Sequence, residues 1–434
     1  MKSVLGVLLF IVTFVAVFCD VANRNVTLTP MPDCDKYKLE CDIAKDKGFV
    51  VVFATAYAKG DSLLYAFSSI GMPTIALVRV TGDNASMHFN WTKLINESSL
   101  EEAITIEDHT KVAYRMGLAF PRLLEYNDED DQADLKHMNS KPNNASYWKI
   151  RDFSDFNWSL DYGSQTKNAF ILTATSEQGS LIDTNSTGNW SISFKFTVQG
   201  GSGRDPELPS LKFGANQTQF DFVISNFTPT YASSRFAVET VLVSQSSSEM
   251  NVDTSKSIDD EYSPGVFQMI NWLSNPSEQQ STGFVQWKPV CYTTSDRSRS
   301  TATKVKDYEL LDLTEQENIT RYLNSSIVLS IFGADLYNEK VVTSRATNIS
   351  FGLSQDRFYD NTNYTVWSAA IGFGTPPQDA ISMTVIVTIG AGLGLPVIIL
   401  ILGGVYTCVK KRRSKQTEYE PITGTVDRTE LVIN

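Results

Sequence analysis

SISFKFTV, residues 191–198, places Ile192, Phe194, Phe196 and Val198 at alternate positions, with polar residues between them. A period of two residues is typical of a β-strand that buries one face and exposes the other. Seven further runs are short, rich in Val, Ile, Phe and Thr, and bounded by turn-forming residues: 49–58, 73–80, 169–175, 220–225, 236–243, 327–332 and 348–353. Helical periodicity is scarce and is clearest over residues 313–323. The sequence therefore predicts a mainly β fold.

A polar, serine-rich stretch at residues 244–257 separates two groups of predicted strands. Such a composition is typical of a linker, and a body of about 360 residues exceeds the usual size of one domain. We therefore expect a β-domain at residues 20–243 and a smaller, membrane-proximal one at residues 258–380. The acidic residues 127–144 are expected to form an exposed, solvated loop, because they lack the ligand spacing and central glycine of a calcium loop.

Both ends of the chain carry membrane-targeting patterns. Residues 1–19 combine Lys2 with a short apolar run and small residues, which is typical of a cleaved signal peptide; an uncleaved anchor is the alternative. Residues 381–409 contain no charged side chain and are long enough for a transmembrane helix. The basic run that follows would face the cytosol. The expected topology is single-pass type I, with a luminal N-terminus and a cytosolic tail at residues 410–434.

Glycines in the predicted span favour contact with another helix. Gly390 and Gly394 form a G-x-x-x-G pair, which lets a second backbone approach closely, and Pro396 can kink the helix. The second helix would belong to another membrane protein or to a second copy of this chain, as a homodimer. A helix without a partner is an equally weighted alternative, because Gly and Pro are common in membrane helices in general.

Asn-X-Ser/Thr sequons are concentrated on one side of the predicted span. The chain has fourteen of them, all before residue 364, whereas its composition would give about five by chance. This excess predicts a heavily N-glycosylated luminal body. The predicted acceptors are Asn25, Asn84, Asn90, Asn96, Asn144, Asn157, Asn185, Asn189, Asn216, Asn226, Asn318, Asn324, Asn348 and Asn363.

Charge and cysteine content narrow the class of protein further. Without Lys2 and the tail, the lumen has 30 basic and 45 acidic residues, a net charge of −15, which argues against nucleic acid or an anionic lipid surface as its ligand. Cys34 and Cys41 are close enough to close a small disulfide loop, which would leave Cys291 unpaired or joined to another chain. A pairing through Cys291 is the alternative.

Catalytic and metal-binding motifs are weak in this sequence. His88, His109 and His137 are widely separated and belong to no metal-binding pair. No G-x-S-x-G elbow, Gly-rich phosphate loop or C-x-x-C motif is present. We therefore expect no enzyme activity, no metal and no cofactor. A carboxylate-pair hydrolase tethered to the membrane stays open as an alternative, because so many acidic residues always contain candidate pairs.

Two segments, SIDDEYSPGVFQ at residues 257–268 and GFVQWKPV at residues 283–290, closely resemble the glycosylated lysosomal membrane protein family. SSIGMP at 68–73, PRLLEY at 121–126 and GFGTPP at 372–377 support the resemblance in the same order. It implies luminal domains of β-sandwich type, hence a tandem arrangement here. It also implies an accessory subunit that stabilises a lysosomal major-facilitator dipeptide transporter and shields it from lysosomal proteases.

The tail carries a sorting pattern of its own. Tyr419 and Ile422 form a Y-x-x-Φ signal, which a clathrin adaptor binds as an extended peptide with pockets for the two side chains. Twelve residues follow Ile422, whereas the tails of similar family members tend to end near the signal. The expected location is the lysosomal membrane, and a cell-surface adhesion or ligand receptor is the alternative.

Overall fold

The computed structural model describes residues 23–378, apart from 83–84, 97–99, 164–167, 176–188, 205–210, 247–248, 257–265, 276–281, 314 and 360–361, together with residues 388–389, 392 and 394–416. These residues divide into two compact units, one up to Gln378 and one beyond it.

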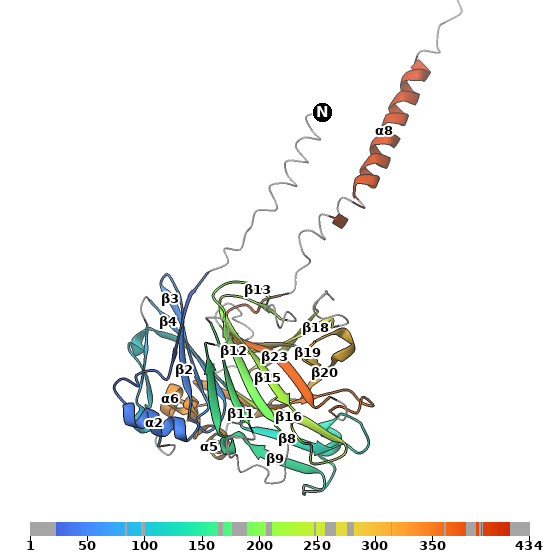
Figure 1. Cartoon of the computed structure of the whole chain (residues 1–434). Coiled ribbons are helices and arrows are strands. Elements are labelled where there is room, and N and C mark those ends of the chain that lie inside the picture. The colour runs from blue at the N-terminus through green and yellow to red at the C-terminus, as the bar shows by residue number, and fades with distance from the viewer. Residues whose placement is uncertain are drawn as a thin grey trace, which may run out of the picture. The chain divides into compact units, whose positions relative to one another are not determined.

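Nineteen strands of the first unit are hydrogen-bonded into one sheet, which folds over into two facing layers (Figure 1). The first layer contains β1 (Asn25–Pro30), β2 (Val51–Ala58), β3 (Asp61–Ser68), β4 (Thr74–Thr81), β7 (Val112–Ala119), β8 (Arg122–Asn127), β9 (Trp148–Asp152), β16 (Ser234–Gln245), β21 (Leu311–Asp312) and β22 (Val342–Phe351). The second layer contains β10 (Trp158–Tyr162), β11 (Ala169–Thr175), β12 (Ser191–Val198), β15 (Gln217–Ser225), β17 (Asn251–Lys256), β18 (Gln268–Leu273), β19 (Gly283–Tyr292) and β23 (Tyr364–Phe373).

Strand β20 (Ala302–Asp307) joins the layers, because it pairs with β19 on one side and with β22 on the other. Two small two-stranded sheets stand apart from the main sheet: β5 (Met87–Phe89) with β6 (Ile104–Ile106), and β13 (Gly203–Arg204) with β14 (Lys212–Phe213). The predicted mainly β fold is confirmed, in the form of a large β-sandwich.

The core lies between the two layers and is rich in aromatic side chains. Strand β12 follows the expected alternation: Phe194 and Phe196 are fully buried, and the ring of Phe194 lies 4.9 Å from that of Phe120 in the opposite layer. Phe67 of β3 contacts Phe170 of β11 across the same core, with ring centroids 5.1 Å apart. Each aromatic pair of this kind stabilises the fold by about 0.5–1.5 kcal/mol beyond the contribution of the apolar area that it buries.

Helices cover much of the outer face of the first layer (Figure 1). They are α2 (Lys38–Asp46), α3 (Trp91–Leu94), α5 (Gln316–Leu323), α6 (Ile327–Phe332) and the 3₁₀ turn η7 (Gly333–Tyr337). Short turns elsewhere are α4 (Leu135–Met138), η2 (His109–Lys111), η3 (Phe153–Asp155) and η6 (Arg299–Thr301). The helix predicted at residues 313–323 corresponds to α5, shortened at its start.

Residues 327–332 were expected to form a strand, and that prediction is wrong, because they form helix α6. The hydroxyl of Ser326 caps the helix by accepting a hydrogen bond from the N–H of Val328 at 3.3 Å. Nearly every residue of this short segment is buried against β4, β7 and neighbouring helices. A short, wholly apolar run has no periodicity that separates a buried helix from a buried strand.

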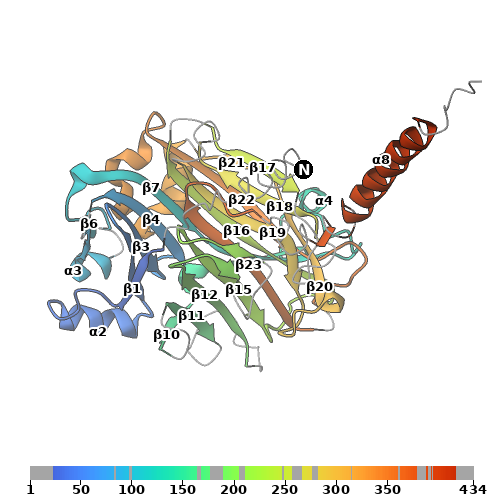
Figure 2. The ribbon, with the colours of Figure 1, turned by 90° about the horizontal axis from the view of Figure 1, so that it is seen from above.

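The predicted division into two tandem domains is also wrong. Residues 244–257 are largely strand, since β16 extends to Gln245 and β17 occupies Asn251–Lys256. Strands from the two proposed domains are interleaved: β22 pairs along β16, and β23 lies between β15 and β19 (Figure 2). The misleading signal was β17, an edge strand with exposed residues on both faces, which has the polar composition of a linker.

The second unit contains helix α8 (Leu395–Gln416), which includes the basic run Lys410–Arg413. Most of the predicted span between residues 381 and 394 lies outside the described residues. Within the part of the chain that the structure describes, no helix is long and apolar enough to cross a membrane.

Candidate functional site

The predicted glycan acceptors lie on the surface wherever the structure describes them. Asn84 and Asn185 fall outside the described residues. The other acceptors are either exposed or half-buried, and none of them is buried. The exposed group is Asn25, Asn96, Asn144, Asn189, Asn226 and Asn363, and the half-buried group is Asn90, Asn157, Asn216, Asn318, Asn324 and Asn348.

Several acceptors already use their side-chain oxygen. Oδ1 of Asn90 accepts a hydrogen bond from the N–H of Lys93 at 3.2 Å and caps α3. Oδ1 of Asn216 accepts from Nε of Arg24 at 2.8 Å, and Oδ1 of Asn324 accepts from the hydroxyl of Tyr337 at 2.5 Å. An N-linked sugar is attached through Nδ2. These contacts can therefore persist in the glycoprotein.

Three acceptors that are distant in sequence gather at one end of the second layer. Asn189 lies just before β12, Asn226 just after β15 and Asn363 just before β23. The register places the start of β12 beside the end of β15, and the end of β15 beside the start of β23. The N–H of Asn226 donates to the carbonyl of Asn363 at 2.6 Å. Glycans at these positions would cover one end of the sandwich.

Cys34 and Cys41 form a disulfide, with their Cα atoms 5.8 Å apart. It anchors the start of α2 to the turn after β1, next to Trp91, whose Nε1 donates to the carbonyl of Pro32 at 2.6 Å. Cys291 is a buried thiol outside this disulfide, so the alternative pairing of Cys34 or Cys41 with Cys291 is wrong. Burial raises the pKa of the Cys291 thiol, which makes it a poor nucleophile.

The remaining predicted residues lie in or near the C-terminal unit. Gly390, Tyr419 and Ile422 are outside the described residues. Gly394 is described, and an added Cβ would meet no atom within 4 Å there. The glycine-pair and sorting hypotheses therefore stay predictions.

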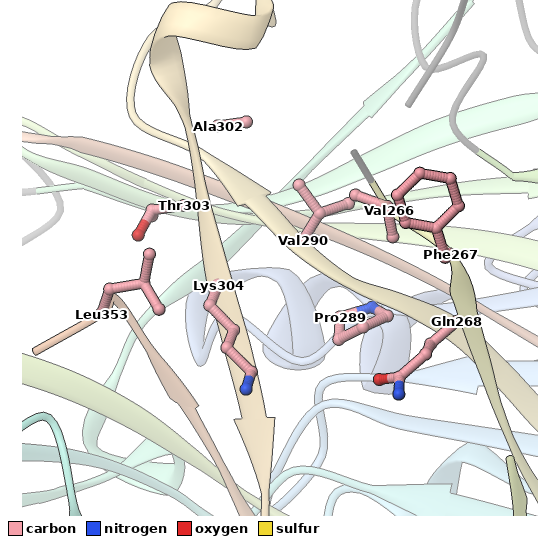
Figure 3. Close-up of a pocket in the computed structure, with 9 residues that line it drawn as sticks. All are labelled: Val266, Phe267, Gln268, Pro289, Val290, Ala302, Thr303, Lys304 and Leu353. Atoms are coloured by element: carbon pink, nitrogen blue, oxygen red, sulfur yellow. The ribbon is translucent and has the colours of Figure 1, made fainter. Parts of the chain in front are cut away.

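An apolar groove opens where β18 and β20 diverge along the same side of β19 (Figure 3). Strand β18 pairs with β19 as far as Trp287, and β20 pairs with it from Val290 onward. Pro289 lies in the gap and has no N–H to leave unpaired. The groove has a volume of about 400 Å³ and is lined by Val266, Phe267, Gln268, Pro289, Val290, Ala302, Thr303, Lys304 and Leu353. We call it the β18–β20 groove.

Two large apolar side chains at this groove are open to solvent. Phe267 is 58% exposed and Leu353 is 46% exposed. Both family-like segments contribute to the lining, the first through residues 266–268 and the second through residues 289–290. That the two segments meet could not be predicted from the sequence, because their contact depends on the pairing of β18 with β19.

A rigid tryptophan cluster lies in the core beside the groove. Opposite the gap in β19, three residues, Lys288 to Val290, bulge against Ser368 of β23. The ring of Trp287 is packed edge-on against Trp272 at 4.6 Å and against Trp367 at 6.2 Å. All three indoles are buried. The groove is therefore a preformed surface of the fold.

The wall formed by Leu353 is held by a buried ion-pair cluster around Arg235. Nε of Arg235 donates to Oδ2 of Asp128 at 2.5 Å, and Nη2 donates to Asp131 and to the carbonyl of Leu353. Nη1 lies 3.0 Å from Oδ1 of Asp356 in an ion pair without hydrogen-bond geometry. Asp356 in turn accepts from the N–H of Leu353 at 2.6 Å.

The acidic segment 127–144 is therefore only partly the solvated loop that the sequence predicts. Asp128 is buried against Arg235, and Asp134 accepts from the N–H of Lys136 at 2.9 Å as the N-cap of α4. Asp131 also pairs with Arg235, whereas Asp130 lies on the surface, with its carboxylate 3.1 Å from Nζ of Lys141. The sequence does contain one sign of buried ion pairs, which is a charged residue inside an apolar strand, such as Glu125 in PRLLEY. A charge in that position needs a buried partner.

Glu125 has that partner in Arg151, whose Nη1 lies 2.7 Å from Oε2 of the carboxylate. The hydroxyls of Thr230 and Ser234 also donate to Glu125, at 2.8 and 2.5 Å. This arrangement neutralises the carboxylate and fills its lone pairs. The cluster is accordingly a structural anchor at the end of the core.

The histidines stay apart in the fold, as their sequence positions suggest. His137 pairs with Asp130 at 3.1 Å on the surface, while His88 and His109 lie on β5 and η2. Within the described ranges, no three His, Cys, Asp or Glu side chains are grouped in a way that could hold a metal ion.

Comparisons with known proteins agree with one another. The sequence model of the glycosylated lysosomal membrane protein family matches residues 50–414. Glycosylated lysosomal membrane protein A of Xenopus laevis is 32% identical over 381 residues, which cover 87% of this chain and 90% of the relative. The Danio rerio protein is 32% identical over 379 residues, covering 86% and 88%, and the Homo sapiens protein is 26% identical over 370 residues, covering 85% of each.

Proposed function

Because this chain belongs to the glycosylated lysosomal membrane protein family, we propose that it is a single-pass type I glycoprotein of the lysosomal membrane that stabilises a major-facilitator transporter as its accessory subunit. Its luminal sandwich would contact the transporter and shield it from lysosomal proteases, without catalysis of its own. The relatives are named as lysosomal membrane glycoproteins, which supports the location and the glycosylation.

The distribution of glycan acceptors and apolar surface carries the proposal. None of the nine described residues that line the β18–β20 groove is an acceptor, although the groove adjoins one, because Val266 and Val290 of its lining pack in one cluster with Tyr364, beside Asn363. Glycans exclude protein partners from the surface they cover, and exposed apolar side chains in a rigid setting favour contact with one. We propose that this groove is part of the surface that contacts a luminal segment of the transporter.

The groove is tested by changing Phe267→Asp and Leu353→Asp in the full-length protein. A carboxylate in a buried apolar contact would be left without a partner, so each change should lower recovery of the transporter at least tenfold in affinity purification from native membranes. Leu39→Asp is the matched control, since Leu39 is a 70% exposed leucine of α2, away from the groove. Loss of binding in the control as well, or no loss in either groove variant, would contradict the assignment.

Stabilisation is tested by removing the chain from cells. The transporter's protein level should then fall more than its messenger RNA, and inhibitors of lysosomal proteases should restore the protein. Hydrolysis of glycans or peptides at acid pH by the purified full-length protein would instead favour a tethered hydrolase.

Sorting is tested by Tyr419→Ala and Ile422→Ala. Loss of adaptor binding should move the protein to the cell surface. An unchanged lysosomal location would show that the tail signal is not used or that the partner supplies the address. Leucines at Gly390 and Gly394 should weaken the complex only partly, because one membrane-helix contact contributes about 0.6–2 kcal/mol.

A further inference from the structure

The acceptor Asn348 has an unusual place in the fold. It lies inside β22, opposite Glu239 of β16, on the outer face of the first layer. The other described acceptors lie in loops, in or beside helices, or at the first residue of a strand. A sugar on Asn348 must therefore leave the sheet across the side chains of neighbouring strands.

Those side chains form a second groove, next to α4 and β9. It has a volume of about 370 Å³, within the range of pockets that hold small molecules. Trp148 and Ile150 of β9, Asn139 and Lys141 after α4, and Asn348 itself are among its lining residues. We call it the Asn348 groove.

One atom in this groove lacks a hydrogen-bond partner. Oδ1 of Asn348 is buried and accepts no hydrogen bond from the described residues. An unpaired buried acceptor costs about 1–3 kcal/mol. The first sugar of an N-linked glycan carries hydroxyl and acetamido N–H donors close to the linkage, so it can supply the missing donor.

The lining also suits a saccharide. An aromatic ring such as Trp148 can stack against the apolar face of a sugar. Arg122 and Glu239 line the same groove, and Nε and Nη2 of Arg122 donate to the two carboxylate oxygens of Glu239, at 2.6 and 2.8 Å. Fixed polar groups of this kind give a sugar's hydroxyls defined partners.

We propose that the first sugars of the glycan on Asn348 lie in the Asn348 groove, which makes it an intramolecular saccharide-binding site. The inference rests on the luminal topology in the proposed function. A seated glycan would protect its own linkage and cover apolar surface at Ile150, which is 46% exposed in the bare chain. The exposed acceptors Asn25 and Asn226 have no such shelter.

The test is site-resolved deglycosylation of the purified full-length glycoprotein. A peptide-N-glycosidase hydrolyses the amide bond between Cγ and Nδ2 of the glycosylated asparagine. The sugar leaves as a glycosylamine and Asn becomes Asp, which mass spectrometry detects at each site. Under native conditions, release at Asn348 should be at least tenfold slower than at Asn25 and Asn226. After denaturation the three rates should agree.

Two variants separate binding from simple crowding. Trp148→Ala should raise the native release rate at Asn348 severalfold and leave the other sites unchanged. Trp148 also packs against Tyr126, with ring centroids 5.9 Å apart, so Ile150→Ser provides a second variant that changes a half-exposed side chain. Release rates that are unaffected by both variants would overturn the proposal.

Three further outcomes are decisive. An unmodified Asn348 in a protein that is glycosylated at the other acceptors, or a native release rate equal to that at Asn226, would overturn the saccharide site alone. Absence of glycan at every acceptor would instead overturn the luminal topology and with it the proposed function.

Discussion

Replacing Arg235 by methionine should be among the most damaging single changes in the sandwich. Met fills similar volume but removes the cation that Asp128, Asp131 and Asp356 share. Asp128 is fully buried and would retain only the backbone N–H donors of Gln132 and Ala133, at 3.1 and 2.8 Å. Breaking a buried pair on one side costs about 3–5 kcal/mol.

This cost can be converted into a melting shift. With an unfolding entropy of about 2.1 cal/mol/K per residue, a body of about 350 residues loses about 1.4 °C per kcal/mol. Arg235→Met should therefore lower the Tm of the detergent-solubilised glycoprotein by about 4–7 °C. Because Nη2 of Arg235 also holds the carbonyl of Leu353 at 2.9 Å, transporter recovery should fall with it.

The control is Arg345→Met. Arg345 pairs with Asp312, which is half exposed, and such pairs contribute about 0–1 kcal/mol. The double change Arg235→Met with Asp128→Asn should recover part of the lost Tm, since it no longer buries an unpaired charge. Equal Tm losses for Arg235→Met and Arg345→Met would refute the argument that burial sets the cost.

Burial raises the pKa of Asp221 to about 6, although Ser368 and nearby cations act against the rise. The folded state then binds this proton more tightly than the unfolded state, so the free energy of unfolding should fall as pH rises from about 4 to 6. Asp221→Asn should flatten that slope and stabilise the protein at neutral pH by about 1–3 kcal/mol in denaturant titrations. The Cys34–Cys41 disulfide closes a loop of seven-residue separation, so replacing both by Ser should cost about 2–2.5 kcal/mol of unfolding free energy, whereas no loss would show that α2 holds its position without it. Gly71 and Gly60 both have positive φ, but an added Cβ at Gly71 would lie 2.0 Å from the carbonyl oxygen of Ser325, whereas one at Gly60 would meet no atom within 4 Å. Gly71→Ala should therefore lower Tm several degrees more than Gly60→Ala. Similar losses of Tm would show that the clash with Ser325 does not set the cost.

The strands were predictable because their signal is local. The alternation at Phe194 and Phe196 depends only on which face of one strand is buried. Whether the strands form one domain or two, in contrast, is not decided by local sequence. It depends on β22 and β23 returning to pair with β16 and β15, about 100 to 150 residues earlier in the chain, and no composition change marks such a return.

Of the candidate site, only features carried by one residue or by a few neighbouring residues could be predicted from the sequence. A sequon is visible in three residues, and Cys34 and Cys41 are neighbours. The β18–β20 groove, in contrast, is made by a gap in strand pairing beside Pro289. The cluster around Arg235 joins three segments that are separated by about a hundred residues each, so neither partner is evident in advance.

On the luminal topology that we propose, the open edges of the interleaved sheet are the strands that a lysosomal protease meets first. Within the described strands, β1 pairs only with β2, and β10 only with β11, so each presents an open edge. Asn25 begins β1 and Asn157 directly precedes β10, which places a predicted glycan at each edge. At the opposite side of the second layer, β17 has no acceptor, but most of its residues, including Asp253 and Lys256, are exposed and charged or polar. Sugars and charges both discourage pairing with another extended chain. Since β22 and β23 tie the early and late strands together, a protease must open these protected edges before it can separate any smaller unit.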